Sequence, residues 1–108
     1  MLPLDRAIQT PTILTMPNLN YDQFRIQALT EGFDEVLERE WDPLTLVDMH
    51  THPFSVRALV TRGEMWLTVG DLTRQLRPGD TFELGRDEPH AERYGSEGAV
   101  YWVARRND

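Results

Sequence analysis

Polar and apolar residues alternate over short stretches along most of the chain, as in β-strands with one buried face. From residue 33 onward these stretches are separated by glycine, proline and aspartate turn signals. The predicted strands are 33–41, 44–50, 56–62, 64–69, 72–76, 80–84, 90–94 and 99–105. The Gly70-Asp71 pair between two of them predicts a tight hairpin. Many short strands at close spacing, with no helix among them, predict an all-β sandwich or barrel.

One segment before this region has helical periodicity. Its apolar residues recur at helical spacing: Tyr21, Phe24, Ala28 and Leu29. Asn20 can cap the start and Gly32 the end, so we expect a short amphipathic helix. The preceding residues contain three prolines and no sustained periodicity, which predicts an extended arm with a short edge strand at 12–15. We therefore expect one domain, with the arm and helix over 1–32 and the barrel over 33–108.

Composition narrows the class of function. The 108 residues carry a net charge of −7, and every basic side chain is arginine. This balance argues against nucleic-acid and anionic-membrane partners, which need clustered positive charge. The absence of cysteine excludes disulfides, thiolate catalysis and thiolate metal ligands. The start lacks the pattern of a signal peptide and no apolar run is long enough to span a bilayer, so we expect a cytoplasmic protein.

The chain has three histidines, and their spacing indicates a shared site. His50 and His52 are two residues apart, so in a strand they face the same side about 6–7 Å apart. His90 follows Pro89 at the start of a later strand, where pairing can bring it to the same place. Imidazole is a common ligand of Zn, Ni, Fe, Cu and Mn. On spacing alone, two surface or capping histidines are the alternative interpretation.

Several short motifs together resemble the cupin superfamily over about residues 44–105. They are His50-Thr51-His52-Pro53-Phe54, Gly63-Glu64, Pro78-Gly79-Asp80 and Pro89-His90. In that family a first motif carries two histidines, a glutamate and then a glycine, and a second runs from a Pro-Gly-Asp turn to a histidine. The resemblance implies a small RmlC-like cupin, a double-stranded β-helix or jelly-roll barrel. It places His50, His52 and His90 at metal-ligand positions.

The resemblance fails at one ligand position. The glutamate of the first motif corresponds to Val56, which cannot bind a metal, and neighbouring Arg57 would repel one. The glycine and proline of the second motif are replaced by Asp87 and Gly85. Among carboxylates that could substitute, Glu92 is best placed, because it shares the face of His90 in a strand. Three further glutamates precede the first motif: Glu35, Glu38 and Glu40.

Two accounts of function follow. In the first, three histidines bind a divalent ion (Zn, Ni, Fe, Cu or Mn) with open positions for a small polar molecule. In the alternative, a metal-free cupin is a small-ligand binding module or uses histidine as a general acid or base. Neither account assigns a catalytic residue. Small cupins commonly form dimers, so the resemblance also implies a homodimer, in which the N-terminal arm pairs with the partner's sheet edge.

Other candidate pocket residues come from strand phase. Tyr101 and Trp102 are adjacent, so one must face inward and line the pocket with Val56 and Glu92. We expect Arg57, Arg74 and Arg93 on a solvated face. The final residues 105–108 have the composition of a frayed tail.

Overall fold

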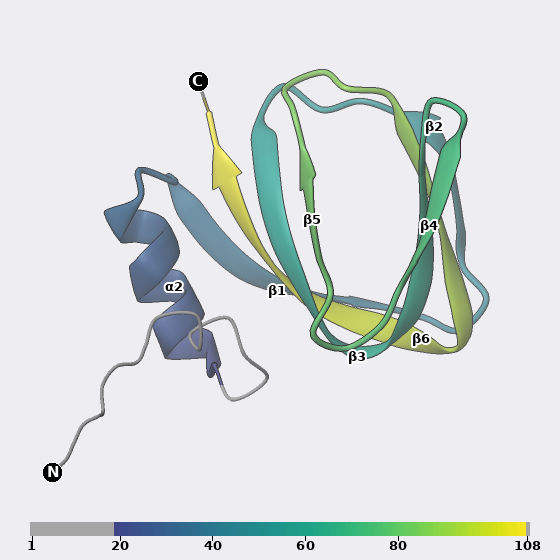
Figure 1. Cartoon of the computed structure of the whole chain (residues 1–108), viewed down its shortest axis with the longest axis horizontal. Coiled ribbons are helices and arrows are strands. Elements are labelled where there is room, and N and C mark those ends of the chain that lie inside the picture. Colours follow the sequence, from purple (N-terminus) through teal and green to yellow (C-terminus); the bar gives the residue numbers. More distant parts are fainter. Residues whose placement is uncertain (1–18, 108) are drawn as a thin grey trace, which may run out of the picture.

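The computed structural model describes residues 19–107, which form one helix and six strands (Figure 1). Helix α2 spans Tyr21–Thr30. The strands are β1 (Glu35–Trp41), β2 (Leu46–His50), β3 (Ser55–Val69), β4 (Leu72–Leu76), β5 (Thr81–Leu84) and β6 (His90–Arg106). The predicted arm and edge strand at 12–15 lie outside the described residues. Over 19–107, no helix has the length and apolar character needed to cross a membrane.

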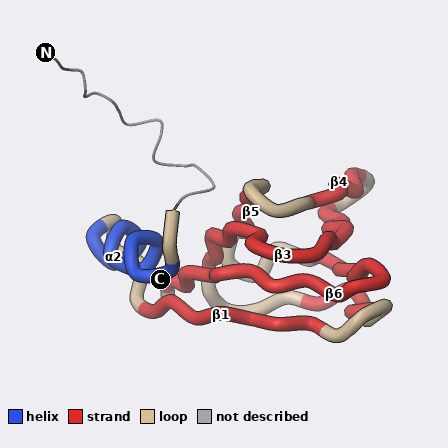
Figure 2. The backbone as a smooth tube through the Cα atoms, turned by 90° about the horizontal axis from the view of Figure 1, so that it is seen from below, coloured by secondary structure: helices blue, strands red, loops and turns tan. Residues whose placement is uncertain are grey.

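Two long strands, β3 and β6, form the central ribbon of the fold. The first half of β3 pairs with the last half of β6, and the last half of β3 pairs with the first half of β6, both in antiparallel register. A further strand pairs with each outer edge of these two paired regions. The β1 and β5 strands flank one end of the ribbon, and β2 and β4 flank the other. The result is one six-stranded antiparallel sheet that curls into two layers around a common interior, because β3 and β6 contribute to both layers (Figures 1 and 2). The predicted all-β jelly-roll barrel is therefore confirmed.

The prediction of separate strands at 56–62 and 64–69, and at 90–94 and 99–105, was wrong. Each pair is one continuous strand, and the glycines that suggested turns lie at bends within it. A Cβ on Gly63 would lie 2.1 Å from the carbonyl oxygen of Gly98, and both residues have positive φ. The β3–β6 register shifts on both sides of Gly63. Glycine here permits close backbone approach and a bulged bend, and it does not end the strand.

The predicted helix is confirmed, together with its caps. The Asn20 side chain accepts a hydrogen bond from the Gln23 amide, and the Gln23 side chain accepts one from the Asn20 amide. This reciprocal capping box satisfies two amides at the helix start. After the helix, Gly32 has a φ of +98°. Phe24 and Ala28 are buried against the outside of the barrel, in a cluster with three other residues: Phe33, Leu59 and Ala104.

The hairpin predicted at Gly70-Asp71 is confirmed, since Val69 pairs with Leu72 across it. The main core lies between the two layers of the sheet and includes residues from both, among them Ala58, Val60 and Met65. Towards one end of the barrel this interior opens into a pocket.

Candidate metal centre

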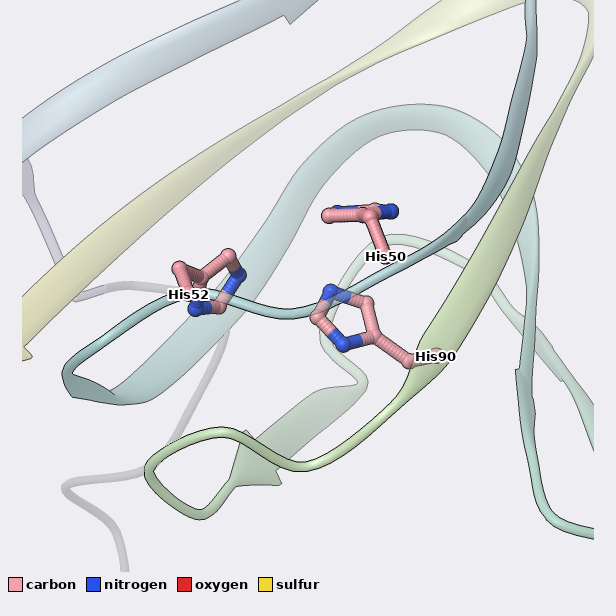
Figure 3. A group of neighbouring side chains, drawn as sticks. All are labelled: His50, His52 and His90. Atoms are coloured by element: carbon pink, nitrogen blue, oxygen red, sulfur yellow. The ribbon is translucent and has the colours of Figure 1, made fainter.

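The three histidines converge at one end of the barrel (Figure 3). His50 is the last residue of β2 and pairs directly with His90, the first residue of β6. His52 lies just beyond β2, in the loop that leads to β3. One nitrogen from each ring can be chosen so that all three lie within 4.8 Å of one another. Strand pairing therefore brings together residues that are 40 positions apart in the sequence.

Backbone contacts fix the proton on two of the rings. Nδ1 of His50 lies 2.8 Å from the carbonyl oxygen of Asp48, and Nδ1 of His90 lies 2.8 Å from that of Glu88. A carbonyl oxygen can only accept, so Nδ1 carries the proton in both rings. In the neutral form, Nε2 of each ring then presents a lone pair to the site. Metal-binding histidines typically donate their other ring N–H to a backbone carbonyl or a carboxylate in this way.

His52 is held by the loop between β5 and β6. The backbone amide of Asp87 donates to the carbonyl oxygen of His52 at 2.9 Å, and Asp87 has a φ of +58°. The family's glycine falls at this position, and aspartate is among the side chains that tolerate left-handed backbone. The pKa of His52 is lowered by burial and by its neighbour His90, which favours the neutral ring.

Glu92 extends the cluster with a carboxylate. Its Oε2 lies 3.4 Å from Nε2 of His90 and 3.6 Å from Nε2 of His50, and its side chain is 8% exposed. Its Oε1 accepts a short hydrogen bond from the hydroxyl of Tyr94. Of the carboxylates considered from the sequence, Glu92 is the one that lies beside the histidines. Glu38 instead accepts a hydrogen bond from Trp102, and Glu40 pairs with Arg62.

This donor set fits a divalent cation. Nε2 of His90 and Nδ1 of His52 are buried and have no hydrogen-bond partner within residues 19–107. With neutral rings, lone pairs from His50 and His90 also face the Glu92 carboxylate, which is unfavourable unless a positive charge lies between them. Three imidazoles and one carboxylate are ligands suited to zinc, iron, nickel, copper or manganese.

The histidines form part of the wall of a pocket of about 160 Å³ between the two layers of the sheet. This is below the range of about 300–1,000 Å³ typical of drug-sized ligands, so the pocket suits a small molecule. Its remaining wall is mostly apolar or aromatic and is lined by Trp41, Phe54, Val56, Phe82, Leu84, Tyr101 and Val103, with Arg39 and Arg105.

Two tyrosines and a tryptophan stiffen the wall beside Glu92. Tyr94 stacks on Trp41 at 5.0 Å between ring centroids, and the indole nitrogen of Trp41 donates to the hydroxyl of Tyr101 at 3.2 Å. Burial raises the pKa of Tyr94 and of Tyr101, so both phenols stay protonated. Tyr94 therefore remains a donor to Glu92, which orients the carboxylate towards the histidines.

Of the other residues selected from the sequence, some line the pocket and some lie on the outside of the barrel. Val56, Glu92 and Tyr101 line the pocket, but Trp102 does not. Because β6 alternates, Trp102 faces the outside of the barrel and packs against Phe24 at 5.9 Å. Arg57 also lies outside and pairs with two glutamates.

Two charged residues of the pocket were not selected from the sequence. Arg39 faces inward from β1, and Arg105 faces inward from β6. Arg105 was expected in a frayed tail, but β6 continues to Arg106 and pairs with both β1 and β3 there. The available signal was strand phase, since residues 101, 103 and 105 share one face.

Comparisons with known proteins agree with this architecture. The family model of the AraC-like ligand-binding domain matches residues 33–106. A cupin-like protein from Thermotoga maritima has a similar structure (23% identity, TM-score 0.60, covering 67% of this chain and 56% of that one). So does an RmlC-like cupin from Shewanella frigidimarina (19% identity, TM-score 0.60, covering 68% and 67%).

The DMSP lyase DddQ from Ruegeria pomeroyi is also similar (26% identity, TM-score 0.59, covering 68% of this chain). This chain spans 36% of the DddQ chain and 37% of a second DMSP lyase chain that it matches. No curated protein sequence matches the chain significantly.

Proposed function

The chain belongs to the AraC-like ligand-binding domain family, within the cupin superfamily, and from this premise we propose that it binds a small polar molecule at a divalent metal centre. His50, His52 and His90 would hold the ion, with Glu92 as a carboxylate ligand or close neighbour. The observation that carries the proposal is the buried, unpartnered Nε2 of His90 facing a carboxylate. When bound, a divalent ion supplies a Lewis acid that polarises an oxygen atom of the ligand.

This chain's own residues would shape the rest of the site. The apolar wall, including Val56 and Phe82, would exclude water from the ligand. The hydrogen bond from Tyr94 would hold Glu92, and the carbonyls of Asp48 and Glu88 would hold two imidazoles in the metal-binding tautomer.

Metal analysis of the full chain, purified without affinity tag or chelator, tests the proposal. We expect about one divalent ion per chain. Replacing any one histidine by alanine should lower the affinity by more than about 10- to 100-fold, which is the typical cost of losing only a residue that orients a ligand. Glu40→Gln, at an exposed ion pair outside the site, is a matched control that should bind metal normally. A content far below one per chain that added zinc, manganese, iron, nickel or copper does not restore would refute the proposal.

A metal-free site is the second candidate, and the proximity of Glu92 to two imidazoles supports it. There, protonated histidines would pair with the carboxylate, and the pocket would bind its ligand directly or use histidine as a general acid or base. The histidine tautomers distinguish the two, because all three histidines in the chain belong to this cluster. Nitrogen-15 NMR of the metal-free protein at pH 7.5 should show neutral rings protonated at Nδ1 for His50 and His90. Doubly protonated rings would favour the metal-free account.

A further inference from the structure

Two arginines of the pocket wall have no acidic partner among the residues that the structure describes. Arg105 follows Tyr101 and Val103 on the inward face of β6, and Arg39 is the register partner of Tyr101 on β1. Within residues 19–107, no carboxylate forms an ion pair with either guanidinium. By contrast, Arg57 on the outer surface pairs with two glutamates. The inward arginines are thus distinguished by their location and by their lack of a counter-ion.

Arg105 lies on the same wall as the histidine cluster. Its guanidinium carbon lies 4.7 Å from the ring centroid of Phe54, and that ring stacks on His52 at 4.5 Å. Nε of Arg105 is buried and has no hydrogen-bond partner in the described part of the chain. Glu35, its register partner on β1, is exposed and forms no ion pair with it. Leaving a buried guanidinium donor unsatisfied is costly, which indicates that an acceptor belongs there.

The charge of the pocket indicates an anion. Glu92 is the one acidic side chain among the described residues that line it, and its Oε1 accepts a hydrogen bond from Tyr94. Two guanidinium groups and one carboxylate leave a net positive charge, and a bound divalent cation would add to it. Planar guanidinium groups recognise carboxylates through paired hydrogen bonds. The apolar wall between the arginines and the histidines suits a short hydrocarbon body, which inorganic anions lack.

We propose that the ligand of this pocket is a small organic acid whose carboxylate is bound by Arg105 and Arg39. The opposite end of the acid faces the histidines. This inference deepens the proposed function and rests on it for the identity of the pocket. It adds the chemical class of the ligand and two residues that select it.

Calorimetric titration of the full chain, zinc-loaded and metal-free, tests the inference with three probes: butyrate, its neutral isostere butyramide, and inorganic phosphate. We expect butyrate to bind at least about 10-fold more tightly than butyramide, because its contacts are charge-assisted. Arg105→Gln should remove most of this preference in both metal states. Arg62→Gln is the matched control, since its side chain is 74% exposed and lies outside this pocket, and it should keep the preference.

Arg105→Lys and Arg39→Gln accompany the test, with thermal unfolding as the check of folding. The lysine variant keeps the charge but loses the planar pair of donors, so it should show an intermediate preference. If Arg105→Gln does not fold, the other two variants decide: an undiminished preference for butyrate over butyramide in both Arg105→Lys and Arg39→Gln would overturn the inference. Equal binding of butyrate and butyramide, an undiminished preference in Arg105→Gln, or tighter binding of phosphate than butyrate would also overturn it, while metal binding would stand. An Arg105-dependent preference in a protein that takes up no metal would support the acid pocket and refute the metal centre.

Discussion

Replacing Glu92 by glutamine separates the two charge states of the histidine cluster. Glu92→Gln keeps the side-chain shape and the oxygen that accepts from Tyr94, and it removes the negative charge. The amide nitrogen that replaces Oε2 can donate to Nε2 of His90, 3.4 Å away. With neutral imidazoles, the substitution therefore gives a buried acceptor the hydrogen bond that it lacks.

The substitution should change the stability of the metal-free protein and its metal affinity in opposite directions. One new neutral hydrogen bond should raise the free energy of unfolding of the metal-free protein by about 0.5–1.5 kcal/mol. For a domain of this size, that is a rise in Tm of roughly 2–10 °C. The metal affinity should fall by about 10- to 100-fold, because an anionic oxygen beside two ligands is lost. A mutation that stabilises the metal-free protein and weakens its metal binding is uncommon, which makes the pair of results diagnostic.

Thermal unfolding followed by circular dichroism in the presence of a chelator measures the first effect, and zinc titration measures the second. Glu40→Gln, whose side chain is 73% exposed, should change neither. If Glu92→Gln instead destabilised the metal-free protein and left zinc affinity unchanged, the carboxylate would be acting as the counter-ion of a protonated imidazole. The neutral-ring reasoning would then be refuted.

Three further predictions concern backbone, surface and pocket. Gly98→Ala should lower the free energy of unfolding by more than about 2 kcal/mol, because φ is positive there and the new Cβ would lie 2.2 Å from a backbone oxygen. Gly70 also has positive φ, but a Cβ there would have nothing within 4 Å, so Gly70→Ala should cost about 1–2 kcal/mol; equal costs in urea denaturation would contradict this. Arg57 lowers the pKa of Glu31 below its ordinary 4.5, so this pair stabilises the fold above that pH, and the contribution is lost as pH falls through the lower folded pKa. Both side chains are more than a third exposed, so Glu31→Gln should lower the free energy of unfolding by less than about 1 kcal/mol at pH 7. The free energy of unfolding of this variant should also fall less steeply than that of the wild type as pH decreases below 4.5, and an unchanged pH dependence would contradict a stabilising role of the pair. Val56→Glu should destabilise the metal-free protein and raise zinc affinity at least about 10-fold if the new carboxylate becomes a ligand; unchanged affinity in a chelator competition would exclude that role.

Local pattern was sufficient for most of the fold. Asn20 and the helical spacing after it identified the helix, and the two-residue Gly70-Asp71 turn identified a hairpin. The errors came from glycines with two physical roles. Gly70 ends a strand at a turn, but Gly63 permits two strands to cross closely without ending either. Sequence alone does not distinguish these roles, because the atom that would collide with a Cβ at Gly63 belongs to Gly98, 35 residues away.

In the candidate site, too, some features follow from local sequence pattern and others depend on how distant strands pair. A spacing of two between His50 and His52, and again between His90 and Glu92, predicts shared faces from local geometry alone. Val56 fills a position in the pocket wall where the resemblance implies a carboxylate, and the carboxylate beside the histidines comes from β6. That exchange depends on the register between β2 and β6, which no local pattern contains.

The inward arginines show why composition can mislead about ligands. The chain as a whole is acidic, with a net charge of −7, and this would suggest a cationic ligand. Most acidic side chains lie on the surface, however, where solvent and neighbouring arginines screen them. Inside the pocket the balance reverses, because two arginines, Arg39 and Arg105, line it together with one carboxylate, that of Glu92. The field that a ligand meets is set by these few charges in the pocket wall, so the net charge of the protein and the preferred charge of its ligand can have the same sign.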